Sequence, residues 1–461
     1  MSPMPDPEPP APLSGSALPI DHRARLQPGI IQPRALQPGT ADVPIPEHLA
    51  AASAQPAPVG RLFVTLYALA YMGTWLALMC PVLVTLSLKM TALVGSDRAP
   101  GQLALVTGTG ALLAMFGNPL FGSLSDRTTS QFGMRRPWML IGFAGGLVGI
   151  VIVAVAPTVP VALVGWCITQ LMFNAVLATQ TAVLPDHVPA KQRGTVSGIL
   201  GICMPIALVI GSYIVQLFSP DQFLMFVVPT VIAAIPVIAF AVLLKDRRLA
   251  PADRIPFSAK EFASSFYVNP LANRDFSWAF VSRFLFILAY SFLTTYQTFY
   301  LIHRVGVGAD DVAHVVFLGT LANSTVWIVL SLVGGPLSDR LRRRKPFVLT
   351  ASAVYGIALV VLAVATHQNG YLIAMTIAGL GMGVYMAVDL ALVTDVLPDT
   401  EHAAKDLGVF NIASALPQSI APAIAPAILA VGGRSYSFLY AVAAVVAVLG
   451  ALAVLRVRSV H

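Results

Sequence analysis

The sequence predicts an all-α integral membrane protein in which twelve transmembrane helices form two pseudo-symmetric six-helix bundles. Composition is the first reason, since 57% of the residues are hydrophobic, only 11% are charged, and the mean hydropathy is +0.78. Soluble domains contain about 25% charged residues. The second reason is that apolar stretches long enough to cross a bilayer recur from residue 60 to near the C-terminus.

The third reason is an internal repeat. The sequence Gly-x-Leu-Ser-Asp-Arg occurs at Gly122–Arg127 and again at Gly335–Arg340, and each copy is followed by basic residues and a proline. A Leu-Pro-Asp follows each copy, ending at Asp186 and at Asp399. Both features recur at an offset of 213 residues, which indicates a duplicated unit. Duplicated helical bundles in membranes are mostly transporters.

Each span is an apolar run bounded by polar or turn-forming residues. In chain order the predicted spans are 60–86, 102–124, 138–156, 159–184, 194–217, 222–244, 277–302, 312–337, 346–366, 370–396, 406–431 and 436–456. Six spans therefore belong to each half.

The segments outside the spans are predicted from their composition. Residues 1–58 contain 14 of the 35 prolines and no apolar run that resembles a signal peptide, so we expect a disordered, Pro-rich cytoplasmic tail. The first bundle then covers residues 59–244 and the second 277–456. A cytoplasmic loop, 245–276, joins them and should contain a short amphipathic helix near 258–266, and residues 457–461 form a cytoplasmic C-terminus.

Basic residues set the predicted orientation. With both termini in the cytoplasm, only Lys89, Arg98, Arg304 and Arg434 fall on the outer side, while Arg283 lies within a span. This asymmetry predicts a multi-pass protein of the cell membrane with cytoplasmic termini. The net charge of +7 is therefore a signal of topology, and because it is scattered over short loops it does not indicate nucleic-acid binding.

The twelve spans, with the repeated loop between spans 2 and 3 and between spans 8 and 9, resemble the major facilitator superfamily. The string Leu124–Pro137 contains Ser-Asp-Arg, Phe-Gly and Arg-Arg-Pro in that order and resembles, more narrowly, the sucrose-transporter and glycoside–pentoside–hexuronide cation-symporter branch. The resemblance implies alternating access, with spans 1, 4, 7 and 10 lining a central cavity. Symporters of this branch generally use acidic residues in the first-half cavity helices, and this chain has none there.

The two repeated loops are candidate gates, a role that the resemblance also implies. Their glycines would permit close helix approach, their aspartates can accept hydrogen bonds near a helix N-terminus, and their arginines can pair with acids across the bundle boundary. Contacts of this kind form in one conformation and break in the other. The alternative is that the arginines only anchor the topology. The candidate gating residues are Gly122, Asp126, Arg127, Arg135, Arg136, Gly335, Asp339 and Arg340.

Charged residues inside spans are costly and usually functional. Arg283 in span 7 and Asp389 in span 10 lie about 12 and 15 Å from the same membrane face by helical rise. We expect them to pair, as a proton-responsive element, as part of the substrate site, or as a structural ion pair.

Polar and aromatic residues in the cavity-lining spans suit a hydroxylated substrate, because sugars need hydrogen-bonding partners and an aromatic face. The same residues would also fit an amphipathic compound or serve helix–helix contacts. The candidate substrate contacts are Tyr71, Trp75, Asn174, Gln297, Tyr385 and Asp389.

Enzyme classes fit poorly, because the chain lacks the common hydrolase, metalloprotease and phosphate-loop motifs. Cys80, Cys167 and Cys203 lie inside spans without metal-ligand spacing, so we expect packing roles and neither a metal nor a cofactor. The sequence thus predicts a monomeric secondary transporter for a small polar solute, with a sugar or glycoside favoured and a proton as candidate coupling ion. The alternatives are a proton-linked exporter of amphipathic compounds and a transporter-like membrane sensor.

Overall fold

The computed structural model describes residues 58–254, 274–341, 344–395 and 403–457. The predicted tail, the predicted amphipathic helix near 258–266 and Asp399 lie outside these residues. Within them, twelve helices are long and apolar enough to cross a membrane, so the predicted fold class is confirmed. Helices suit this environment because every backbone polar group is satisfied within the segment.

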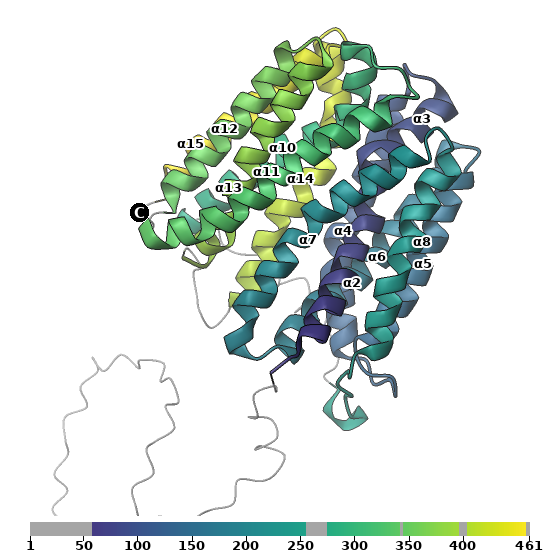
Figure 1. The fold of residues 1–461 in the computed structure, drawn as a ribbon, viewed down its shortest axis with the longest axis vertical. Helices are drawn as coiled ribbons and strands as arrows, with labels where there is room; N and C mark the ends of the chain where they lie inside the picture. The colour runs from purple at the N-terminus through teal and green to yellow at the C-terminus, as the bar shows by residue number, and fades with distance from the viewer. Residues whose placement is uncertain (1–57, 255–273, 342–343, 396–402, 458–461) are drawn as a thin grey trace, which may run out of the picture. The chain divides into compact units, whose positions relative to one another are not determined.

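The helices of the first half form one group and those of the second half another (Figure 1). The first bundle contains α2 (Arg61–Cys80) continued by the π-helical η1 (Pro81–Thr85) and α3 (Leu86–Val94), then α4 (Ala99–Asp126), α5 (Arg136–Val155), α6 (Val159–His187), α7 (Ala190–Leu217) and α8 (Gln222–Leu243). The 3₁₀ turn η2 (Pro251–Asp253) follows. The second bundle contains α10 (Arg274–Tyr300) continued by the π-helical η3 (Leu301–Val305), then α11 (Val312–Leu341), α12 (Lys345–Val364), α13 (Gln368–Asp395), α14 (Ala403–Val431) and α15 (Tyr436–Val454).

Local sequence explains where several helices begin. A proline stands in the first turn of α4, α5, α6 and α12, where its missing N–H has no helical partner to lose. Asp221 and Ser435 cap α8 and α15 by accepting hydrogen bonds from the backbone N–H groups of Leu224 and Phe438.

The first span is longer than the sequence predicts. It continues through η1 and α3 to Val94, whereas the prediction ended at residue 86. The extension carries Lys89 into the helix, where the side chain is 8% exposed. Its ammonium donates a 2.7 Å hydrogen bond to the backbone carbonyl of Ala154, at the C-terminal end of α5. The charge is therefore satisfied by a helix end that has free carbonyls, which a scan for apolar runs does not detect.

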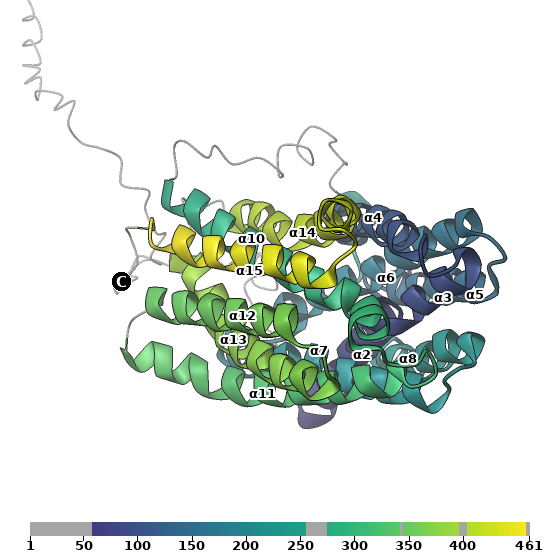
Figure 2. The same cartoon turned by 90° about the horizontal axis from the view of Figure 1, so that it is seen from above.

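The two bundles meet mainly along two helix pairs, α4 with α14 and α7 with α11, and η1 also contacts α10 and α11. Figure 2 shows α14 next to α4, and α11 running beneath α13 toward the first bundle. We call the end at which α2 begins and α15 ends the terminal end, and the opposite one the far end. At the middle of the α4–α14 pair the backbone approach is close, because a Cβ added to Gly108 would lie 3.3 Å from the carbonyl oxygen of Ser419.

Polar contacts between the bundles, among the residues that the structure describes, all lie at the far end. Thr298 donates to the carbonyl of Leu83 at 2.9 Å, and both groups are buried. The others join Tyr296 to the Pro100 carbonyl, Ser219 to the Asp310 carbonyl, His314 to Gln216, and Arg434 to Asp97. The structure therefore shows a conformation in which polar contacts join the two bundles at the far end.

A proline leaves free one of the backbone carbonyl acceptors near these contacts. Pro426 lacks the N–H that would bond to the carbonyl four residues earlier, that of Pro422. The hydroxyl of Tyr296 lies 3.2 Å from this carbonyl and donates to it. Pro426 thus leaves free a carbonyl acceptor of α14 to which α10 attaches.

Candidate functional site

The structure brings Arg283 and Asp389 together. Arg283 lies nine residues after the start of α10, and its Nη1 is 2.5 Å from Oδ2 of Asp389 on α13. Asp389 is the more enclosed partner, with 7% of its side chain exposed against 19% for Arg283. Arg283 is therefore the more accessible partner of the pair.

Two residues of α14 complete the surroundings of Arg283. Its Nε donates a 2.7 Å hydrogen bond to Oγ of Ser414, and its guanidinium carbon lies 5.1 Å from the ring centre of Phe410. A cation above an aromatic face is stabilised by the ring quadrupole. The pair therefore joins three helices, α10, α13 and α14. Ser414 and Phe410 were not predictable from the sequence, because no spacing in the chain links them to Arg283.

Below the pair, aromatic rings fix the position of α13 against α10. Tyr385, one turn before Asp389, stacks on Phe286 at 3.7 Å between ring centres and with 3° between their planes. Phe286 also contacts Tyr355 of α12, at 5.2 Å. Tyr385 is only 1% exposed, so in this conformation it supports the pair from behind.

The other candidate substrate contacts divide by exposure. Tyr71 and Trp75 on α2 are half-buried and form an edge-to-face pair at 6.3 Å. Asn174 is buried and donates to the carbonyl of Gln170, one turn earlier in α6. Gln297 is 1% exposed and accepts a 3.0 Å hydrogen bond from the hydroxyl of Tyr371. In this conformation, Asn174 and Gln297 therefore make helix contacts.

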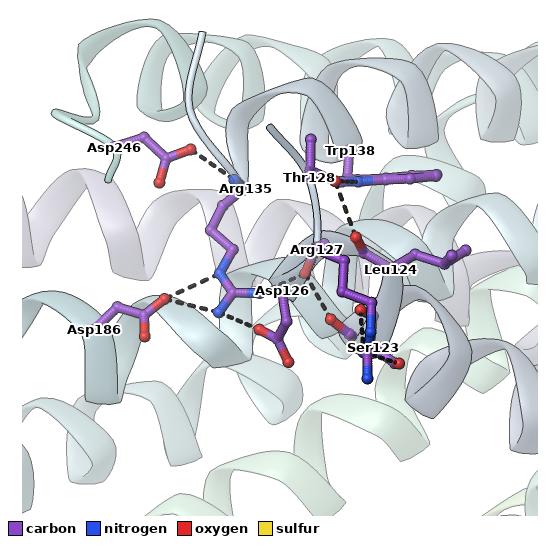
Figure 3. Close-up of polar contacts among 11 residues, drawn as sticks. Ser123, Leu124, Asp126, Arg127, Thr128, Arg135, Trp138, Asp186 and Asp246 are labelled. Carbon is purple, nitrogen blue, oxygen red and sulfur yellow. Dashed lines mark hydrogen bonds and ion pairs between the residues drawn. The ribbon is translucent and has the colours of Figure 1, made fainter. Parts of the chain in front are cut away.

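The first candidate gating loop is organised around Arg135 (Figure 3). Its Nη2 lies 2.6 Å from Oδ1 of Asp126 and 2.9 Å from Oδ2 of Asp186, while its Nε donates to the same Asp186 oxygen at 2.9 Å. Its Nη1 donates to Oγ of Ser125. Arg135 is 6% exposed, so one buried cation ties the ends of α4 and α6 to the start of α5. These described partners belong to the first bundle, and not to the second bundle as the sequence analysis expected.

Asp246, just past α8, closes the loop from the other side. Its Oδ2 accepts hydrogen bonds from the backbone N–H groups of Arg135 and Arg136, at 2.6 and 2.9 Å, where α5 begins. A carboxylate at a helix N-terminus is favoured by the free N–H groups and the helix dipole. Gly133 makes room for it: its φ is +104°, and a Cβ there would lie 2.3 Å from Asp246. No pattern in the chain predicts this contact, which joins residues 111 positions apart.

The adjacent Arg136 stabilises the end of α8. Its Nε and Nη2 donate to the backbone carbonyls of Ala241 and Val242, at 2.6 and 3.0 Å. Arg127 turns back along α4, where its Nη1 donates to the carbonyl of Ser123 at 2.8 Å. Trp138 donates from Nε1 to the Thr128 hydroxyl at 2.8 Å (Figure 3).

The second loop repeats part of this arrangement. Arg344 donates from Nη1 to Oγ of Ser338 at 3.0 Å, as Arg135 does to Ser125. Arg340 is exposed, and the side chain of Asp339 lies outside the described part of the chain. The expected close approach at the glycines is not present in this conformation. A Cβ on Gly122 would meet no described atom within 4 Å, and one on Gly335 would meet only the Ala387 carbonyl, at 3.8 Å.

No cluster of three or more His, Cys, Asp or Glu side chains positioned to hold a metal ion occurs in the described ranges. The chemistry available at the Arg283–Asp389 pair is therefore that of an ion pair with one accessible edge. It can bind a charged or hydrogen-bonding group and can exchange a proton.

Comparisons with known proteins agree with this architecture. The family model of the Major Facilitator Superfamily matches residues 63–329 and 314–461. No curated protein is similar enough in sequence to count as a match. Among solved structures, the chain is similar to a bacterial homologue of the human lysosomal transporter Spinster in an inward-facing, unoccupied conformation, with a TM-score of 0.62, 14% identity, and coverage of 86% of this chain and 98% of that one.

Two further solved structures share the fold. The peptide transporter POT in complex with alafosfalin gives a TM-score of 0.68 at 16% identity, covering 89% of this chain and 97% of that one. A variant of the nucleoside transporter NupG gives 0.67 at 12% identity, covering 86% and 98%. At such identities the likeness shows the fold alone.

Proposed function

This chain belongs to the major facilitator superfamily, and from that premise we propose that it is a secondary active transporter that moves a small polar solute across the membrane by alternating access. We favour a sugar or glycoside as the substrate and a proton as the coupling ion. The solved structures of similar fold include a peptide transporter and a nucleoside transporter, so the fold accommodates small polar solutes of several kinds.

The Arg283–Asp389 pair is the observation that carries this proposal. Placing two charges inside membrane spans costs free energy, so such a pair usually serves a function. Here the cation of the pair remains partly accessible. Asp389 is then the acid that takes up and releases the coupling proton. The half-buried Tyr71 and Trp75 supply an aromatic face for the substrate from the first bundle.

The far-end contacts support a conformation that is open toward the terminal end. With the cytoplasmic termini that the basic residues favour, this is the inward-facing state of a cell-membrane transporter. The candidate gating loops lie at the ends of α4 and α11 that belong to this side. We propose that they form their closing contacts in the opposite state, and that the protein acts as a monomer.

Uptake of radiolabelled sugars into proteoliposomes, with and without an inward proton gradient, tests the proposal. Gradient-stimulated uptake of one sugar supports a proton symporter. Outward movement of an amphipathic dye without any sugar flux would instead support the exporter. Absence of saturable flux in either direction would overturn the transporter proposal and favour a membrane sensor.

A further inference from the structure

The accessible edge of the Arg283 guanidinium has no partner within the described part of the chain. Nε is bonded to Ser414 and Nη1 to Asp389. Nη2 has no hydrogen bond, and it is also absent from the buried polar atoms that lack one, so it is not fully buried. A solute that reaches the pair therefore meets N–H donors before it meets the carboxylate.

We propose that the transported solute carries a carboxylate, which binds this edge of Arg283 and is moved together with one proton held on Asp389. This inference rests on the proposed transport function and narrows its substrate to an organic monoanion with hydroxyl groups. An arginine presents paired N–H donors that match the two oxygens of a carboxylate.

The residues around Arg283 allow it to exchange the Asp389 carboxylate for that of the solute. Ser414 and Phe410 hold the guanidinium through contacts that do not depend on Asp389, so the arginine stays in place when its anionic partner changes. Phe286 and Tyr385, each one turn from a member of the pair, stack on each other and are buried, as is Asp389. The site therefore has a fixed cation and a replaceable anion.

Charge balance explains why a proton should accompany the carboxylate. Arg283 and Asp389 together are neutral, and a second carboxylate would leave a net negative charge in a span, which is costly. A proton taken by Asp389 restores neutrality and weakens its hold on Arg283. Among described residues, Tyr385 is the other titratable group at the pair. From α14, the described neighbours of the pair are Ser414 and Phe410, neither of which titrates. On α12, Tyr355 is separated from the pair by Phe286. The described part of α11 brings no charged side chain to it. One proton should therefore accompany one carboxylate, without net charge movement.

A matched pair of probes tests this inference, D-gluconate against its neutral counterpart D-glucitol. We expect proteoliposomes with an inward proton gradient to accumulate gluconate in preference to glucitol. A membrane potential imposed with valinomycin should not change the rate. Arg283→Gln should lower gluconate uptake by about 10–100-fold, the loss expected for a charge-assisted hydrogen bond, and Arg283→Lys should retain part of it. Arg304→Gln, at an exposed site on η3 at the far end of the same span, should behave as the unmodified protein.

The outcomes separate this inference from the proposed function. Uptake of neutral sugars at least as good as that of gluconate, or gluconate uptake that persists in Arg283→Gln, would overturn the carboxylate proposal and leave a transporter in place. Gluconate uptake that responds to membrane potential would overturn the one-to-one proton balance. A lack of flux for both gluconate and the neutral sugars would reject both proposals.

Discussion

Asp389 holds a negative charge within a membrane span because Arg283 lies beside it, at 2.5 Å. Removing either partner from such a pair leaves a buried charge without compensation, which destabilises more than the pair itself contributes. Asparagine is therefore the informative replacement for Asp389, since it keeps the shape and a hydrogen-bond acceptor for the arginine while removing the site of protonation.

We expect Asp389→Asn to abolish accumulation driven by a proton gradient while leaving exchange of labelled for unlabelled substrate measurable. Exchange needs the binding site but no net proton movement, whereas accumulation needs a group that loads and unloads the proton. Both rates can be measured in one preparation of proteoliposomes. Full accumulation in the variant would exclude Asp389 as the coupling acid.

Arg135 differs from Arg283 in having two acidic partners, of which Asp126 is 56% exposed and Asp186 is 29% exposed. Loss of Asp126 alone leaves the cation paired. We expect Asp126→Asn to lower transport about fivefold, which corresponds to about 1 kcal/mol for a partly solvated pair, with normal membrane insertion. Asp310→Asn is the matched control, because its carbonyl makes the far-end contact and its side chain is exposed. Equal transport by Asp126→Asn and the control would reject a gating role for Asp126.

Among the structural elements, the start of α5 depends on a contact that crosses from the end of α8. Gly133 has two constraints, a positive φ of +104° and the carboxylate of Asp246 where a Cβ would stand. Gly95 shares only the first, since its φ is +78° and the space around it is open. The two glycines therefore separate backbone strain from the contact with Asp246.

We expect Gly133→Ala to lower the midpoint of thermal unfolding in detergent more than Gly95→Ala does. Each change adds about 1–3 kcal/mol of backbone strain, and only the first also displaces Asp246 from the N–H groups of α5. Combining Gly133→Ala with Asp246→Ala should cost less than the sum of the two single changes, because both remove the same contact. Additive losses would show that Gly133→Ala acts through backbone strain alone and does not displace Asp246.

At the scale of the whole molecule, the bundles are held together at the far end by a small set of hydrogen bonds, of which that from Thr298 to the Leu83 carbonyl is buried. Valine has nearly the same shape as threonine and lacks the donor. We expect Thr298→Val to shift the equilibrium toward the conformation open at the far end by about two- to tenfold, the effect of one net hydrogen bond.

Pulsed electron resonance between labels at Lys191→Cys and Arg274→Cys, which are exposed at the terminal ends of α7 and α10, can measure this shift. A larger share of short distances is expected, because that end closes as the other opens. Thr295→Val, one turn earlier on α10, is the control, since Thr295 is buried and makes no hydrogen bond to the first bundle among the described residues. Identical distance distributions in the two variants would show that the Thr298 contact does not bias the equilibrium.

The fold was largely predictable from the sequence, because a lipid environment makes apolar length a direct signal of a helix. The pairing of Arg283 with Asp389 was predictable for a related reason, since few charged residues occur within the spans and these two lie at similar depth. The position of Lys89 was not, because its charge is satisfied by the carbonyl of a helix that follows much later in the chain.

The partners of each candidate residue were harder to predict. Asp246 and Ser414 are 111 and 131 positions from the arginines that they contact, and their residue types are common. Arg135 shows the same difficulty, because its acids come from its own bundle in this conformation. A sequence identifies which side chains are chemically unusual, whereas their neighbours depend on how helices from distant positions pack.

The two π-helical segments show that the two halves of the chain are not exact copies of each other. In a π turn each hydrogen bond spans one residue more than in an α turn. In the first half, η1 is followed by nine residues of α3 before Gly95, whereas η3 in the second half runs directly into Gly306. The two π segments thus occupy different depths in corresponding helices, so the internal repeat does not extend to the far ends of these helices.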